Sequence, residues 1–302
     1  ARRRASYKPA GPPVLLFADT FTNYFHTDVA QDAVSVLEDA GFQIVVPRQD
    51  VCCGRPLYDY GFLDMARRRL DNVLEVLGPA IRAGMPMVVL EPSCAAVFRD
   101  ELTEMLPDRD EAAQLASQTY LLSEFLETRA PHYRLPRLDT KAVYHAHCHQ
   151  RAIFGTASDA RLLSEMGVEI SIPEAGCCGM AGAFGFERGT HHDVSIACGE
   201  RNLLPAARAE PDSLIVADGF SCREQIIQGS GRTPLHIARV IARGLRETGR
   251  IASQAVPTND QRSRSRKVLL AAGLICTALL VGGWYLSRVR SSAMLSSRPP
   301  AR

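Results

Sequence analysis

Short apolar runs and longer amphipathic stretches alternate along the first 250 residues of the chain. Six runs are rich in Val, Ile and Leu and are typical of strands, at residues 14–19, 43–48, 87–91, 142–147, 168–173 and 214–218. Between them lie stretches with a helical repeat of apolar positions, such as residues 28–40, which Gly41 ends, and residues 65–77. Strands that alternate with helices predict an α/β fold with mostly parallel sheets.

The two halves of this region carry the same landmarks in the same order. The strand ending at Thr20 matches the one ending at Cys148, 128 residues later, and the two Cys-Cys-Gly tripeptides lie 125 residues apart. Cys94 and Cys222, each after a third strand, are again 128 residues apart. We infer an internal duplication that gives two Rossmann-like α/β lobes, at residues 12–137 and 138–250. Residues 1–11 and 251–267 are expected to be linkers.

Residues 268–286 form a run of nineteen positions without a charge. As a helix this run would be about 28 Å long at ~1.5 Å per residue, which is close to the thickness of a bilayer core. Trp284 and Tyr285 stand at one end, where amphipathic rings favour the membrane interface. We therefore expect a single C-terminal transmembrane helix, followed by a basic tail at 287–302. The alternative is a buried core helix. The transmembrane helix, if present, predicts a protein of the cell membrane with its body in the cytoplasm.

The net charge of +2 is unevenly distributed. Residues 262–302 carry eight Lys or Arg and no acid, so the rest of the chain has more acidic than basic residues. The body offers no basic surface of the kind that binds nucleic acid, and we expect no nucleic-acid partner.

Cysteine is the residue type that indicates a functional site in this chain. The odd number of cysteines and the lack of a secretory signal disfavour a disulfide framework. Clustered thiols in a reducing compartment are more often metal ligands or redox groups. The nine cysteines stand at positions 52, 53, 94, 148, 177, 178, 198, 222 and 276.

Four thiols of the second half follow the ends of predicted strands: Cys148, Cys177, Cys178 and Cys222. The carboxyl ends of parallel strands meet at one sheet edge, so these thiols should converge. Thiolates favour iron–sulfur clusters, zinc and copper(I), and two adjacent cysteines can address different irons of one cluster. Gly179 would let the backbone approach such a cluster. Zinc is the competing metal, although its cysteine ligands are usually two to four residues apart.

A second, weaker site is expected in the first half, at Cys52, Cys53 and Cys94, where Thr20 stands in place of a fourth cysteine. Three thiols would need a further ligand, such as Asp19, Glu91 or His26. The alternative is that this half is kept only for structure.

Four other residues are expected to have lesser roles. Next to Cys148, His147 and His149 would either ligate or support the thiolates from a second layer. Cys198 and Cys276 are expected to be small buried hydrophobes.

The strings "AGCCGMAGAFGFE", "HAHCHQ" and "VADGFSCREQI" resemble a known family over residues 12–240. They are similar to the cysteine-rich CCG domain found in heterodisulfide reductase (its B component) and in anaerobic glycerol-3-phosphate dehydrogenase (its C component). The similarity is greatest to the C-terminal part of FAD-linked D-lactate and D-2-hydroxyglutarate dehydrogenases. In the family pattern a lone Cys, a Cys-Cys-Gly and a Cys-x-x-Cys occur twice. Here Thr20, Glu91 and Gly219 replace three of those cysteines.

The resemblance implies a cofactor, partners and a function. The cofactor would be an iron–sulfur cluster of the 4Fe–4S type, with FAD and a ferredoxin-like domain on a partner or on a preceding part of the polypeptide. Electrons would pass from flavin through the cluster to a membrane acceptor such as a quinone. Two alternatives remain open, a thiol or disulfide reductase with the cluster as its active site, and a non-redox zinc-binding or scaffold protein.

Overall fold

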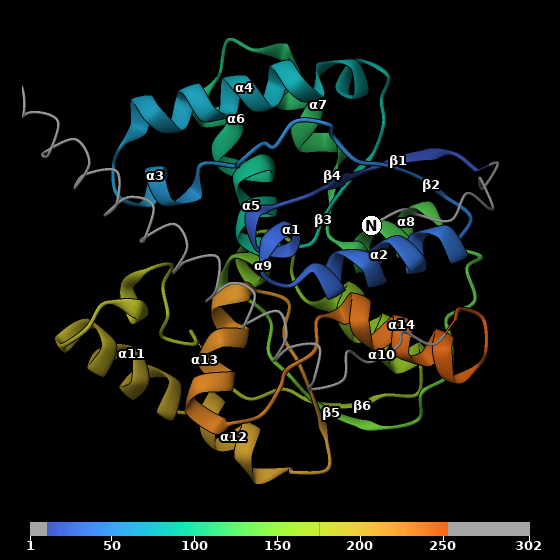
Figure 1. Cartoon of the computed structure of the whole chain (residues 1–302), viewed down its shortest axis with the longest axis vertical. Coiled ribbons are helices and arrows are strands. Elements are labelled where there is room, and N and C mark those ends of the chain that lie inside the picture. The colour runs from blue at the N-terminus through green and yellow to red at the C-terminus, as the bar shows by residue number, and fades with distance from the viewer. Residues whose placement is uncertain (1–10, 175, 253–302) are drawn as a thin grey trace, which may run out of the picture. The chain divides into compact units, whose positions relative to one another are not determined.

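Within the described part of the chain, seven short strands form two parallel sheets, one in each half (Figure 1). The structure is a computed structural model that describes residues 11–174 and 176–252. In the first sheet the strands lie in the order β2 (Gln43–Val45), β1 (Pro13–Phe17), β3 (Met87–Val89) and β4 (Thr119–Tyr120). In the second sheet they lie in the order β6 (Glu169–Ser171), β5 (Lys141–Tyr144) and β7 (Leu214–Val216).

The second sheet repeats three strands of the first. The strand β1 pairs in parallel with β2 and β3, and β5 pairs in the same way with β6 and β7. The pairings between these strands are all parallel, as is that of β3 with β4, which confirms the predicted α/β class with parallel sheets. The shared order supports the duplication that the spacing of the landmarks predicts.

Helices connect the strands in both halves. In the first half they are α1 (Thr20–Tyr24), α2 (Thr27–Asp39), α3 (Arg55–Asp59), α4 (Leu63–Arg82), α5 (Pro92–Ala96), a π-helical turn (Val97–Glu101), α6 (Leu102–Met105), α7 (Asp110–Gln118) and α8 (Leu122–Arg129). In the second half they are α9 (Cys148–Ile153), α10 (Ala157–Glu165), a 3-10 turn (Phe184–Phe186), α11 (Thr190–Glu200), α12 (Leu203–Ala209), α13 (Phe220–Ser230) and α14 (Ile237–Glu247).

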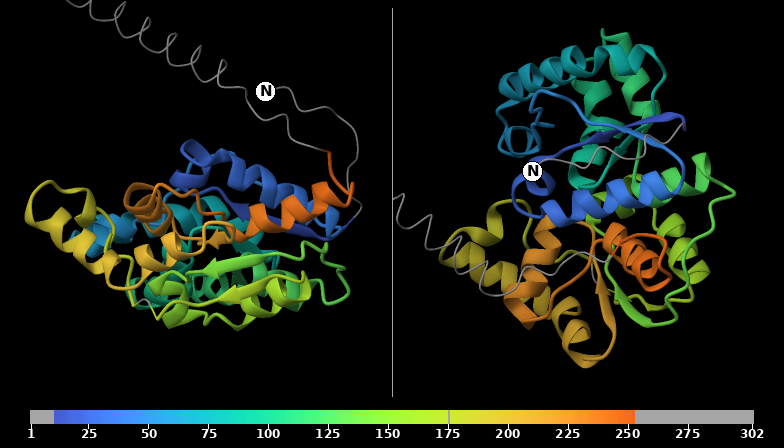
Figure 2. Two further views of the ribbon diagram at one scale, coloured as in Figure 1. Left: turned by 90° about the horizontal axis from the view of Figure 1, so that it is seen from below. Right: turned by 45° about the vertical axis from the view of Figure 1, so that its right-hand side comes forward.

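The two halves share one hydrophobic core. Side chains of α2, such as Val36, belong to the same buried cluster as Tyr144 of β5 and Ile241 of α14. The views of the ribbon agree that α14 lies along α2 (Figure 2). Arg246 of α14 forms an ion pair with Asp32 of α2, whose side chain is fully buried. The described residues accordingly belong to one compact unit. The predicted boundaries of lobes and linkers stay predictions.

All six predicted strands are present, and each ends earlier than its apolar run. For example, β1 ends at Phe17 and β5 ends at Tyr144, two or three residues before the predicted ends. The chain leaves the sheet there to begin α1 and α9. Gly41 has φ of +92° after α2, as expected of a left-handed residue that ends a helix.

The fold prediction was wrong in one element. We expected a transmembrane helix at 268–286, but no helix within 11–174 and 176–252 is long and apolar enough to cross a membrane. Residues 268–286 and the basic tail themselves lie outside the described residues. Over the described residues, the fold that the structure supports is therefore mixed α/β with parallel sheets.

Candidate metal centre

Four thiols of the second half meet beyond the carboxyl ends of β5, β6 and β7. Cys148 is the first residue of α9, directly after the β5 edge, and Cys222 lies in the first turn of α13, directly after β7. Cys177 and Cys178 stand in the loop that follows β6. The structure thus brings together the four cysteines that the sequence groups as one site. Their binding of a cluster stays a prediction.

These thiols form a hydrogen-bonded row in which donors and acceptors alternate. Hydrogen bonds from Cys148 and Cys178 lower the pKa of Cys177, and a hydrogen bond from Cys178 lowers the pKa of Cys222 far below its usual range. The donors Cys148 and Cys178 have pKa values raised by the same bonds and by burial. The hydrogen bonds within the row thus lower the pKa of two of the four thiols toward the thiolate, the form that binds metal.

The Cys-Cys-Gly loop is held by close backbone packing. The N–H of Gly179 donates to Cys177 Sγ at 3.3 Å. A Cβ at Gly179 would overlap the carbonyl oxygen of Ser195 on α11, and its φ of +96° also favours glycine. Gln225 of α13 donates its Nε2 to the carbonyl oxygens of Cys178 at 3.0 Å and Ser195 at 2.9 Å. We missed Gln225, although a polar residue one turn after Cys222 on a buried helix face is a usable signal.

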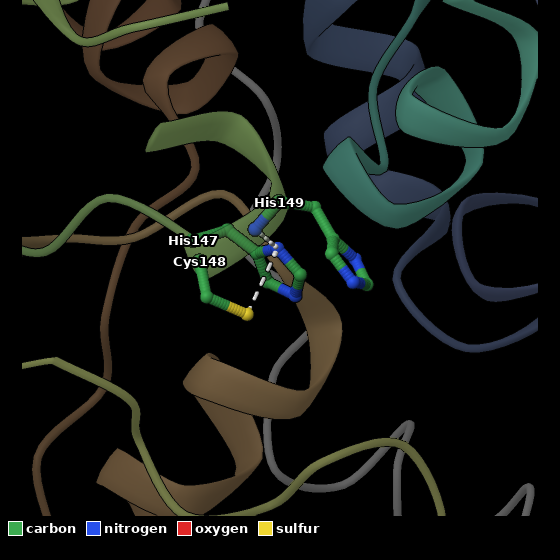
Figure 3. A group of neighbouring side chains, drawn as sticks. All are labelled: His147, Cys148 and His149. Carbon is green, nitrogen blue, oxygen red and sulfur yellow. Dashed lines mark hydrogen bonds between the residues drawn. The ribbon is translucent and has the colours of Figure 1, made fainter. Parts of the chain in front are cut away.

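Two imidazoles flank Cys148 in this site (Figure 3). The ring of His147 is buried, and its Nδ1 lies 4.0 Å from Cys148 Sγ. His149 lies on the far side of the His147 ring, with 5.1 Å between ring centroids. Burial, followed by the charges of Arg55 and His147, lowers the pKa of His149 to about 4. Its Nδ1 is buried and has no hydrogen-bond partner within the described residues. The side chain of His145 hydrogen-bonds to Cys222.

The three thiols of the first half also meet, at the edge of the first sheet. Cys53 Sγ lies 3.0 Å from Cys94 Sγ, and Cys52 hydrogen-bonds to Cys53. The pKa of Cys94 is raised to about 11, because burial and the charges of Asp19 and Glu91 outweigh a hydrogen bond from Cys53 that lowers it. The pKa values of Cys52 and Cys53 are raised as well. Unlike the second set, this set is stabilised as neutral thiols. Cys52 faces a cavity of about 400 Å³ that is also lined by Thr20, Tyr24 and Arg69.

The three side chains that we considered as a further ligand for the first set interact with other partners: Asp19, His26 and Glu91. Asp19 caps α1, where its carboxylate accepts from Phe21 N at 2.9 Å and Thr22 Oγ1 at 2.6 Å. His26 Nε2 lies 3.4 Å from a carboxylate oxygen of Glu224.

Glu91 has a role that the sequence did not reveal, because it joins the two cysteine segments. It accepts hydrogen bonds from Ser93 Oγ at 2.9 Å and from Phe220 N at 2.8 Å, at the start of α13. Burial raises the pKa of this carboxyl.

Cys198 does not join the row of four thiols. Cys198 on α11 lies 3.8 Å from the carbonyl oxygen of Cys177 and packs on the backbone of the loop. Cys276 lies outside the described residues.

The donor set of the second half fits an iron–sulfur cluster. It provides four thiols from three separate segments, a backbone N–H aimed at one of the sulfurs, and a glycine where no side chain is tolerated. The first half provides three neutral thiols and no fourth ligand among the side chains considered above, so its residues fit such a group less well.

The fold and the paired cysteine segments define a cysteine-rich α/β protein with two related halves. The chain matches the cysteine-rich domain family CCG at residues 19–99 and 142–226, which together make up more than half of its length. It belongs to this family, as the resemblance of its motifs predicts.

Similar proteins include components of several dehydrogenase systems. The chain is 28% identical over 250 residues to the C component of the anaerobic glycerol-3-phosphate dehydrogenase of Escherichia coli K12, covering 81% of this chain and 61% of that protein. It is 29% identical over 225 residues to the D-2-hydroxyglutarate dehydrogenase of the same strain, covering 72% and 21%. With lactate utilization protein A of Geobacillus kaustophilus it shares 29% over 213 residues, covering 68% and 86%. The chain thus spans less than two thirds of the first two relatives.

Proposed function

We propose that this chain is the iron–sulfur electron-transfer module of a flavin-linked dehydrogenase that acts on a 2-hydroxyacid or on glycerol 3-phosphate. The convergence of Cys148, Cys177, Cys178 and Cys222 is the observation that carries the proposal. The names of the similar proteins support the dehydrogenase class, since they include a glycerol-3-phosphate and a D-2-hydroxyglutarate dehydrogenase.

An iron–sulfur cluster at this site would supply one-electron transfer. The chain's own residues hold and tune it. The four thiolates would ligate, the N–H of Gly179 would donate to a ligand sulfur, and His145 would do the same at Cys222. Such donors stabilise the reduced state of a cluster and raise its reduction potential. The hydride acceptor, FAD, would belong to a partner or to another part of the polypeptide.

The proposal is tested by purifying the chain without oxygen and measuring iron, sulfide and the EPR spectrum after reduction. We expect iron and sulfide in near-equal amounts, and Cys177→Ser and Cys178→Ser should each abolish or change the spectrum. Cys198→Ser is the matched control, because this thiol touches the same loop without joining the row, and its spectrum should be unchanged. Stoichiometric zinc, or no metal in the wild-type chain, would overturn the proposal.

The electron acceptor is a further part of this proposal, and we place it in the membrane, as a quinone. A reduced chain should then be reoxidised by a water-soluble quinone analogue in a single exponential phase. Failure of every quinone tested, with rapid reoxidation by a protein acceptor instead, would contradict this part alone.

A further inference from the structure

Position 219, directly before α13, is filled by a side chain from another segment. A Cβ built on Gly219 would overlap Cδ2 of His147 and lie 3.2 Å from its Nε2. The imidazole of His147 thus occupies the space that the side chain of residue 219 would otherwise take. Because Cys222 is only three residues further along, this space borders the row of thiols.

The ring of His147 lies beside a thiol of the candidate metal centre. Its Nδ1 is 4.0 Å from Cys148 Sγ (Figure 3). Two ligands of one tetrahedral ion, a nitrogen at ~2.0 Å and a sulfur at ~2.3 Å from the metal, lie about 3.5 Å apart. The observed distance is within about half an ångström of that separation.

The nitrogen that faces Cys148 carries a lone pair instead of a proton. The backbone N–H of His149 donates to Nδ1 of His147 at 3.2 Å, so this nitrogen acts as an acceptor. An unprotonated ring nitrogen is the form that a metal ion requires. Nδ1 has a single lone pair, so the ring must give up the hydrogen bond from His149 N–H when it ligates.

We propose that His147 is a nitrogen ligand of the metal centre formed by Cys148, Cys177, Cys178 and Cys222, in the place that a thiolate from residue 219 would otherwise take. This inference rests on the function proposed above. Exchange of a thiolate for a neutral imidazole removes one negative charge from the ligand set, which raises the reduction potential of an iron–sulfur centre.

The competition between two side chains for one space gives a direct test. Four chains are compared after anaerobic purification with nitrogen-15-labelled histidine: the wild type, His147→Ala, Gly219→Cys, and the double variant with both changes. Iron per chain, the reduction potential and the nitrogen coupling in pulsed EPR are measured on each. His149→Ala is the control, because it removes the neighbouring ring and keeps the backbone N–H.

We expect the nitrogen coupling in the wild type and in His149→Ala, and its loss in His147→Ala. Gly219→Cys should lose at least half of its iron, because the new side chain collides with the ring. The double variant should regain that iron, without nitrogen coupling and at a lower reduction potential than the wild type. Recovery in the double variant also excludes a simple failure of Gly219→Cys to fold.

The two proposals fail in different ways. An iron-loaded wild type without histidine coupling, or a coupling that persists in His147→Ala, would overturn the ligand assignment and leave the proposed function standing. A wild-type chain without iron would overturn the proposed function and the ligand assignment together.

Discussion

Replacing Gly179 by alanine should destabilise the protein more than its backbone conformation alone explains. A φ of +96° costs a non-glycine residue about 1–2 kcal/mol. The new Cβ would also overlap the carbonyl oxygen of Ser195, and forcing such a group into a packed interior costs about 1–3 kcal/mol more. We therefore expect the free energy of unfolding to fall by about 2–5 kcal/mol for Gly179→Ala.

Gly41→Ala is the matched control for this prediction. Gly41 has φ of +92°, and no atom lies within 4 Å of a Cβ built there, so this variant should lose only about 1–2 kcal/mol. Both losses can be measured by urea unfolding of the metal-free chains, with iron loading measured separately. Gly179→Ala should also bind less iron, because the clash displaces the N–H that donates to Cys177. Equal losses of stability in the two variants would refute the packing argument.

Three further predictions concern buried charges. Burial, followed by the charge of a nearby aspartate, raises the pKa of Asp159 from 3.8 to about 6, so the protonated side chain stabilises the fold below about pH 4 and this stabilisation is lost as the pH rises to about 6. In urea unfolding, the difference in unfolding free energy between the wild type and Asp159→Asn should shrink by about 1–3 kcal/mol between these two pH values. A difference that does not change with pH would contradict this prediction. Glu91→Gln should cost about 1–3 kcal/mol of unfolding free energy, because the amide can replace only one of the two acceptor oxygens, and an unchanged urea midpoint would count against the bridge to Phe220. Arg246→Ala should lower the free energy of unfolding by about 3 kcal/mol, because it removes an ion-pair partner of the buried Asp32 carboxylate. Arg243→Ala breaks an exposed ion pair on the same helix and should lower it by less than about 0.5 kcal/mol. Similar shifts of the melting temperature in both variants would refute this prediction.

The fold was predictable where apolar runs and cysteine spacing carried the information. All six predicted strands exist, because each apolar run is long enough to show its pattern. The short strand β4 was missed, since Thr119–Tyr120 is two residues long and no periodicity exists at that length. The grouping of Cys148 with Cys177, Cys178 and Cys222 followed from topology, because residues after parallel strands meet at one edge.

The contacts between the halves could not be read from the sequence. Glu91 was considered as a ligand of the first set because of its position before Cys94, yet its carboxylate turns toward the N–H of Phe220, 129 residues away. Likewise, nothing in the string around Gly219 shows that the ring of His147 fills the space beside it. Both are consequences of how the two halves pack, and a single sequence does not specify such contacts between distant segments.

The asymmetry of the two copies follows from what surrounds each set of thiols. In the second set, hydrogen bonds from neighbouring thiols lower the pKa values of Cys177 and Cys222. In the first set, the acidic side chains of Asp19 and Glu91 and burial raise that of Cys94. The thiolate form is therefore favoured at two cysteines of the second set and disfavoured in the first set, although the strands beneath have the same order. The first half nevertheless supports the second, because Glu91 holds the start of the helix that carries Cys222. The two copies thus differ in their thiol chemistry within one structure, in which the first copy helps to position α13 of the second.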